Sequence, residues 1–459
     1  MTLDFSARRN ALQIGAVSLA LLLPRFAMAQ TAAAAPKIDT GDTAWMLVAT
    51  ALVMLMTPGL ALFYSGMTRS KNALNMLMQS FVALGVVTLV WVLWGYSLAF
   101  GPGGKWLGSL AWVGLNGVGQ APKSDYAATI PHQVFMLYQM MFAIITPALI
   151  SGAIAERMKF STYVLFILLW TTFVYCPLAH WVWGAGGWLG ASGVGALDFA
   201  GGTVVHISSG VSALVAALVL GRRTATRGGH EEDLRPHNLP MTLLGAALLW
   251  FGWFGFNAGS ALASGGLAGS AFLATHVAAA TAGLVWILIE SIAHKKPTAL
   301  GFATGAVAGL VAITPASGFV GPMGAIAIGA GVAFISFFAI GLKRRFHYDD
   351  TLDVFGVHGV GGIWGALATG LFASVAVNSA GANGLFYGGG IALLGRQGLA
   401  VSVAVSYAAL MTFLLATVLK VTVGLRVAPD AEEVGLDLTQ HGETAYNSME
   451  AGTATLHTD

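Results

Sequence analysis

The 459-residue sequence is 56% hydrophobic and 9% charged, which excludes an ordinary soluble domain, where about 25% of residues are charged. Its net charge of +2 and its scattered basic residues exclude nucleic acid as a partner, and its single cysteine, Cys176, excludes disulfides and cysteine-based zinc sites. The composition therefore predicts an all-α integral membrane protein that lies in a lipid bilayer.

The first 29 residues are predicted to be a cleaved signal peptide. Arg8 and Arg9 precede an apolar stretch, residues 11–23, and residues 27–29 supply the small side chains of a cleavage site. The arginine pair is also compatible with twin-arginine export, an alternative that the residues leave open. Residues 30–43 would then form an extracytoplasmic segment.

Eleven apolar runs follow, close to the roughly 20 residues that a helix needs to cross a bilayer. They are residues 44–66, 73–100, 131–155, 161–183, 202–221, 240–262, 267–293, 298–314, 319–342, 354–374 and 397–424. The run at 298–314 is short, and its boundaries are the least sharply marked. The sequence predicts eleven transmembrane helices.

Lysine and arginine alternate between the loops in a way that orients these helices. One set of loops holds Arg69, Lys71, Arg157, Lys159, Arg222, Arg223, Arg227, Arg235, Lys295, Lys296, Lys343, Arg344 and Arg345. The opposite set holds only Lys37, Lys105, Lys123 and Arg396. The positive-inside rule therefore predicts that the N-terminus lies outside and the C-terminus inside.

Two histidines divide the helices into related halves. His206 and His358 each lie on a glycine-rich run, with a glycine four residues later and an aspartate upstream, Asp198 in one run and Asp353 in the other. Each run would be the fifth helix of its half, and one half begins outside and the other inside. The halves would therefore be inverted copies whose fifth helices meet near the midplane.

The predicted organisation follows from these boundaries. It comprises a membrane domain, residues 44–424, with a first half at 44–221, a second half at 240–374 and a trailing eleventh helix at 397–424, and then a cytoplasmic tail, residues 425–459.

Ionisable side chains at membrane depth are costly, so each is a candidate functional residue. A neutral imidazole donates from one nitrogen and accepts at the other, so His206 and His358 could bond to each other and to a small ligand. The alternative is a satisfied interhelical bond without a ligand. His276 is expected to be a core histidine, and Asp198 an N-cap that also supports a neighbouring vestibule. No Cys, Asp or Glu recurs at ligand spacing, so no metal site is predicted.

Aromatic side chains offer a second set of candidates. Trp183, near the outer end of its run, is either a membrane-interface anchor or a π face for a cation. Phe142 and Phe256 would be core packing on periodicity alone. No nucleophile accompanies the histidines, so an enzyme is not predicted.

Three long motifs carry a resemblance to a known family. They are Asp198–His206 (DFAGGTVVH), Trp250–Ser260 (WFGWFGFNAGS) and Asp353–Gly365 (DVFGVHGVGGIWG). On these motifs the chain resembles the ammonium transporter family (Amt/Mep, related to Rh proteins), of the bacterial Amt type, from about Asp42 to Tyr446. The resemblance implies a homotrimer in a bacterial inner membrane, with one pore per subunit and no cofactor.

The resemblance also implies an outer site that recruits NH4+, or methylammonium. By motif position this site would be built from Trp183, Phe142 and Ser260 and supported from behind by Asp198. The match around Phe142 is short, and the glycine-rich loop after Trp183 varies in length.

Further residues of the pore are implied in the same way. Phe142 and Phe256 would form a stacked gate below the outer site. His206 and His358 would be the paired pore histidines, with Trp253 beside them. The ion would lose its proton near the gate, and NH3 would pass the histidines.

The tail completes the resemblance. Residues 435–438 (GLDL), 441–443 (HGE) and 445–447 (AYN) resemble the cytoplasmic segment that couples subunits and receives a PII-type regulatory protein. Without the family, a polar tail of this length would more often be disordered. An ammonium sensor that signals through its tail, with little net flux, is the alternative function.

Overall fold

The computed structural model describes residues 37–227 and 234–446. The predicted signal peptide, residues 1–29, and the end of the predicted tail, residues 447–459, lie outside the described residues. The described residues from Ile38 to residue 446 form one compact unit. This unit is mostly helical, as the composition predicts, because only helices satisfy every backbone group within one apolar segment.

The first part of the described chain, residues 37–227, contains thirteen helices or helical turns. They are α2 (Thr40–Met67), η1 (Ser70–Asn72), α3 (Ala73–Val90), η2 (Trp91–Gly95), α4 (Tyr96–Phe100), η3 (Val113–Leu115), α5 (His132–Ile154), α6 (Phe160–Trp170), η4 (Thr171–Tyr175), α7 (Cys176–Trp183), η5 (Gly202–Ile207), α8 (Ser208–Leu220) and α9 (Thr224–Arg227). The later ones are α10 (Leu239–Ala258), η7 (Gly259–Ala261), α11 (Gly266–His294), α12 (Ala299–Ile313), α13 (Pro322–Phe346), η8 (Phe355–Gly359), α14 (Val360–Phe372), η9 (Leu385–Tyr387), α15 (Ala392–Thr422), α16 (Pro429–Val434) and η10 (Asp437–His441).

Within the described ranges, ten of the predicted spans are long and apolar enough to cross a membrane. The run predicted at 298–314 forms α12, which has 15 residues and would span about 22 Å, short of the roughly 30 Å of a bilayer core. Nearly all of α12 is buried against α10, α11, α13 and α14. A helix that is enclosed by its neighbours need not match the thickness of the lipid.

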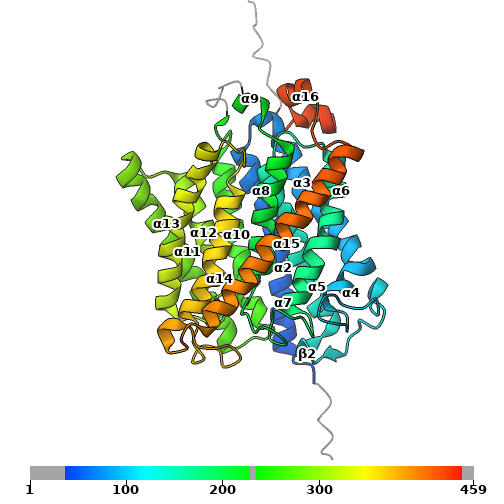
Figure 1. Cartoon of the computed structure of the whole chain (residues 1–459), viewed down its shortest axis with the longest axis vertical. Coiled ribbons are helices and arrows are strands. Elements are labelled where there is room, and N and C mark those ends of the chain that lie inside the picture. Colours follow the sequence, from blue (N-terminus) through cyan, green and yellow to red (C-terminus); the bar gives the residue numbers. More distant parts are fainter. Residues whose placement is uncertain (1–36, 228–233, 447–459) are drawn as a thin grey trace, which may run out of the picture. The chain divides into compact units, whose positions relative to one another are not determined.

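One small sheet interrupts the helices. Strands β1 (Pro122–Lys123) and β2 (Ala127–Pro131) pair antiparallel in the loop before α5. This hairpin lies at one end of the helix bundle, and α9 and α16 lie at the opposite end (Figure 1). The trailing helix α15 crosses the bundle obliquely and packs against α8 and α14, one fifth helix from each predicted half.

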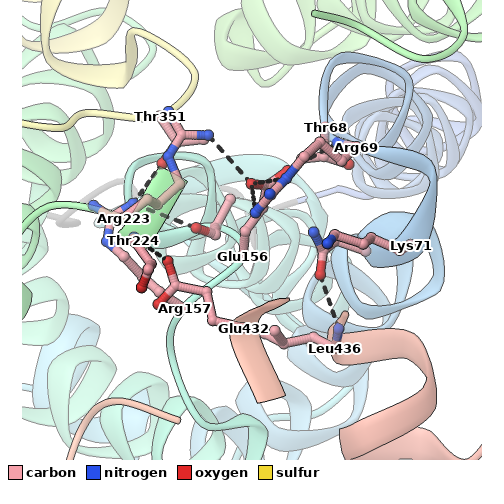
Figure 2. A network of polar contacts seen from close by, with 12 residues as sticks. Thr68, Arg69, Lys71, Glu156, Arg157, Arg223, Thr224, Thr351, Glu432 and Leu436 are labelled. Atoms are coloured by element: carbon pink, nitrogen blue, oxygen red, sulfur yellow. Dashed lines mark hydrogen bonds and ion pairs between the residues drawn. The ribbon is translucent and has the colours of Figure 1, made fainter. Parts of the chain in front are cut away.

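A buried network of ion pairs joins the loops at the end of the bundle that carries α16 (Figure 2). Glu156 Oε2 lies 2.8 Å from Arg69 Nη2 and 3.3 Å from Arg223 Nη1. Asp349 Oδ1 lies 3.0 Å from Arg223 Nη2, and Asp349 Oδ2 lies 3.7 Å from Arg157 Nη1. Burial would raise the pKa of Asp349, but the two guanidinium groups hold it well below its usual range. The network ties the loop after α5 to the loop before η8.

The described part of the tail, residues 425–446, packs on this network (Figure 2). Glu432 accepts a hydrogen bond from the backbone N–H of Thr224 at 2.6 Å and pairs with Arg426 at 2.5 Å. Asp437 accepts from the backbone N–H of Asn75 at 2.8 Å, at the start of α3. A carboxylate at a helix N-terminus complements the helix dipole. The tail is therefore anchored to the first turn of a membrane helix.

Candidate functional site

Both predicted pore histidines lie in π-helical turns that open their helices. His206 lies in η5, directly before α8, and His358 lies in η8, directly before α14. π-Helical turns are rare and occur often at functional sites, because the extra residue per turn redirects the side chains. The two turns lie next to each other in the bundle. The structure thus gives the two histidines the same local backbone.

The two imidazoles meet in the interior of the bundle. The Nδ1 atoms of His206 and His358 are 3.2 Å apart, and the two side chains are 1% and 3% exposed. One Nδ1 must donate and the other accept, so the pair is formed by neutral rings of opposite tautomer. In either arrangement one Nε2 carries a proton and the other a lone pair. The pair therefore offers one donor and one acceptor to a neighbouring molecule.

Glycine allows the helices of the two histidines to approach this closely. A Cβ atom on Gly210 would lie 2.1 Å from the backbone nitrogen of Gly359, and one on Gly362 would lie 3.1 Å from the Cβ of His206. Small residues at helix crossings permit such contacts in membranes. The glycine four residues after each histidine therefore allows the two helices to bring the rings together.

A narrow apolar cavity surrounds the histidine pair. Its lining is apolar apart from the two imidazoles and Trp253. The Trp253 ring stacks on His206 at 5.4 Å between centroids, and its Nε1 donates to Thr314 Oγ1 at 2.9 Å. Trp253 therefore holds one imidazole face without using its hydrogen-bonding atoms.

Phe256 lines this cavity, and Phe142 packs against the Phe256 ring. Their ring centroids are 4.2 Å apart at an interplanar angle of 32°, and both side chains are buried. Phe256 also lies 6.0 Å from the His206 ring. The two phenyl rings thus form an apolar layer directly next to the histidine pair.

The predicted outer residues lie on the other side of this layer. The ring of Trp183 lies edge-on to Phe142, with centroids 6.0 Å apart. Ser260 Oγ donates to the carbonyl of Phe256 at 2.9 Å and lies 3.2 Å from the hydroxyl of Tyr138. Trp183 and Ser260 are partly exposed, whereas the phenyl rings below them are not. An indole ring and two hydroxyl groups therefore lie next to the phenyl layer, on the side away from the histidine pair.

Asp198 acts on the backbone behind this site. Its carboxylate accepts from four backbone N–H groups, those of Gly201, Gly202, Thr203 and Val204, at 2.7–3.1 Å. Its carbonyl accepts from Trp183 Nε1 at 2.9 Å. Burial raises the pKa of the Asp198 carboxyl, although the four N–H groups lower it. Asp198 is an N-cap, and it joins the His206 turn to the Trp183 ring.

The aspartate that plays this part in the second half is not Asp353. Asp350 lies eight residues before His358, as Asp198 does before His206, and its carboxylate accepts from the N–H groups of Val354 and Phe355 at 3.0 and 2.7 Å. Pairing Asp198 with Asp353 was therefore wrong. The motif match began at Asp353, which hid the equal spacing to the histidines.

Two further side chains differ from expectation. Tyr138, which the sequence reasoning missed, donates to the carbonyls of Gly255 and Phe256 at 2.9 and 2.8 Å and so fixes the Phe256 helix. Its position four residues before Phe142, on the same helix face, was the available signal. His276 was expected in the core but is exposed, beside Trp250.

Comparison with known proteins agrees with this geometry. Residues 44–446 match the model of the Ammonium Transporter Family. The chain is 54% identical to "Ammonium transporter" of Bacillus subtilis over 410 aligned residues. The aligned region covers 89% of this chain and 99% of that protein. Among solved structures it is similar to Saccharomyces cerevisiae Mep2, with a TM-score of 0.79 and 37% identity over 86% of this chain and 91% of that one. It is also similar to a "Sensor Amt Protein", with a TM-score of 0.80 and 31% identity, over 87% of this chain and 98% of that one. The chain therefore belongs to the ammonium transporter family, and it is a multi-pass membrane protein.

Proposed function

We propose that the protein recruits NH4+ at the outer site, takes a proton from it near the gate and passes NH3 along the histidine pair. The observation that carries the proposal is the Nδ1–Nδ1 contact of His206 and His358 inside an apolar cavity. The pair offers one donor and one acceptor, which matches a molecule that both donates and accepts hydrogen bonds.

Magnitudes favour a neutral passenger. Moving an ion from water into a protein interior costs several kcal/mol even after relaxation. A cation–π contact returns up to ~2 kcal/mol, and the phenyl layer of Phe142 and Phe256 offers no polar atom. The ion is therefore stable at the outer site and unstable below it. Loss of the proton at this boundary turns the ion into neutral NH3, which does not carry the cost of dehydrating a charge.

The outer site supplies what a cation needs. Trp183 presents a partly exposed π face, and Ser260 Oγ, which donates to a backbone carbonyl, keeps its lone pairs for the N–H groups of the ligand. Asp198 supports the site through the Trp183 ring. This arrangement governs affinity more than passage.

We expect replacement of Trp183 by Leu to raise the half-saturation concentration for methylammonium uptake about tenfold, because ~1.4 kcal/mol of cation–π attraction is lost. An apolar side chain is kept at this position, so the maximal rate should change little. Trp106→Leu removes an exposed outer tryptophan that contacts Trp181 and Trp188 and serves as the control. An unchanged half-saturation concentration in Trp183→Leu would rule out this role.

The proposed orientation follows the charges of the loops. The end with the hairpin would face outward and the end with α16 the cytoplasm of a bacterial cell, with eleven helices arranged as two inverted halves, 44–221 and 240–374, and a trailing helix. Supporting this, His206 and His358 lie at equivalent turns, and each has an aspartate cap eight residues earlier.

A homotrimer is part of the proposal. His276 is exposed on the membrane helix α11, next to a groove lined by Trp45 and Phe272. Polar groups are costly to leave against lipid. A neighbouring subunit that covers this face would supply a partner to the exposed His276 imidazole.

We further propose that the tail receives a PII-type protein on the cytoplasmic side. Glu432 and Asp437 hold the tail against the loops at this end, which presents a shaped surface to a partner. Deletion of residues 431–459 should abolish binding of the partner in a pull-down with purified proteins. Full binding by the truncated protein would contradict the assignment.

Uptake by proteoliposomes tests the proposed function. The purified protein should carry methylammonium into vesicles at a rate that ammonium reduces by competition, and vesicles without protein should not. An ammonium-evoked current would show that the proton follows along the imidazole pair, and its absence that the proton stays outside. A protein that binds its PII-type partner in response to ammonium but shows no uptake would indicate a sensor instead.

A further inference from the structure

Asp353 occupies a backbone position that disfavours any residue with a side chain. Its φ is +60°, in the left-handed region. The equivalent residue of the first half, five positions before the histidine, is Gly201, with φ +114°. Glycine adopts this conformation without strain, whereas other residues pay on the order of 1 kcal/mol or more. A carboxylate is therefore kept where the fold favours glycine, which points to a function for the side chain.

The carboxylate lies where the pore leaves the histidines. The lining of a second cavity includes both His358 and Asp353. It shares Phe63, Val307 and His358 with the cavity of the histidine pair. Asp353 is the charged residue of this lining. A molecule that passes His358 toward the cytoplasm therefore meets the Asp353 carboxylate.

The ammonium group of Lys343 forms an ion pair with this carboxylate. Lys343 Nζ, from the last turn of α13, lies 2.5 Å from Asp353 Oδ1, and both side chains are a little over one quarter exposed. The two residues also line an open groove that continues from the second cavity to the inner end of the bundle. A lysine side chain ends in a primary alkylammonium, the same head group as methylammonium. The occupant thus has the chemistry of the transported ion.

We infer that Asp353 is an inner binding site for ammonium and that Lys343 is a tethered competitor which keeps it from retaining the ion. The inference rests on the proposed function, because it takes the inner end of the pore as the exit. NH3 that leaves the histidines takes a proton from cytoplasmic water where the groove opens, which forms NH4+ and leaves hydroxide in the water. A free carboxylate would then hold the ion, and the Lys343 ammonium displaces it into the cytoplasm.

The test measures inhibition of uptake by ammonium on the inner side. Right-side-out membrane vesicles that contain the full-length protein are loaded with graded ammonium, and initial uptake of radiolabelled methylammonium is recorded. In Lys343→Gln the concentration of internal ammonium that halves uptake should fall about fivefold, the factor that a partly exposed ion pair is worth. The half-saturation concentration on the outer side should stay unchanged.

Three further variants separate the competition of Lys343 for Asp353 from other effects of its charge. Lys343→Arg keeps a cation and should behave as the parent. Arg344→Gln removes the same charge from the same helical turn and groove, without an ion pair to Asp353, and should also behave as the parent. The double variant Lys343→Gln/Asp353→Asn removes the site itself and should restore the parental inhibition.

The outcomes are distinct. If the parent shows no uptake, the proposed function fails. If the parent transports and Lys343→Gln shows the parental sensitivity to internal ammonium in right-side-out and in inside-out vesicles, the inner site is refuted. Equal shifts in Lys343→Gln and Arg344→Gln would also refute it, since a general change in surface charge would then account for the effect.

Discussion

His206→Asp should let K+ pass through a protein that otherwise excludes it. K+ is similar in size to NH4+, but it neither donates hydrogen bonds nor sheds a proton, so a passage restricted to the neutral species rejects it. The neutral pair of His206 and His358 supplies no charge in a cavity that is otherwise apolar. A carboxylate at position 206 offsets the cost of dehydrating a cation. On the proposed mechanism, selectivity in the parent follows from chemistry rather than from radius.

K+ flux into proteoliposomes measures this effect, with K+ competition against methylammonium uptake as a second measurement. His206→Gln is the matched control, because it removes the imidazole and adds no charge. It should slow uptake and still exclude K+. If His206→Asp keeps both ammonium transport and K+ exclusion, the paired-histidine mechanism is wrong.

Gly210→Ala should nearly abolish transport. The added Cβ would lie 2.1 Å from the nitrogen of Gly359, and ordinary contact begins near 3.4 Å, so the helices must separate by about 1.3 Å (3.4 − 2.1) to restore it. The helix that moves carries His358, whose Nδ1 is 3.2 Å from His206. A shift of this size breaks the contact between the rings. Misplacement by about 1 Å can lower a rate by as much as about 100-fold, and we expect uptake to fall on the order of tenfold or more.

Gly85→Ala makes the same change at an exposed position of α3, where a Cβ would meet no atom within 4 Å. It should transport as the parent does. Thermal unfolding in detergent separates loss of geometry from loss of the fold, because overpacking of this kind costs about 1–3 kcal/mol. Parental uptake by a folded Gly210→Ala protein would show that the close crossing of the two helices is not required.

Patterns of local sequence predict much of this architecture. Apolar runs mark the ten long spans because a lipid-facing helix must be apolar along its whole length. The pairing of the two histidines could be predicted from the sequence, because each histidine interrupts an apolar run and each is followed by a glycine four residues later. The π-helical turns around His206 and His358 could not be predicted, since no residue type specifies an extra residue per turn.

Long-range contacts account for most of what was missed. Asp353 was paired with Asp198 because both lie upstream of a histidine, and only the bonded N–H groups show that Asp350 is the cap. Tyr138 contacts carbonyls more than 100 positions away. His276 was placed in the core because a histidine in an apolar run is usually satisfied there, but its helix turns that face outward. Such facts depend on packing rather than on periodicity.

Uptake of methylammonium by the parent protein in the presence of a large excess of K+ tests the central claim most directly. If only the neutral molecule passes the histidine pair, a 100-fold excess of K+ on the outer side should lower the initial rate only by competing at the outer aromatic site, and a saturating concentration of methylammonium should restore the full rate. K+ itself should not enter the vesicles. Entry of K+ at a rate comparable to methylammonium would contradict the account.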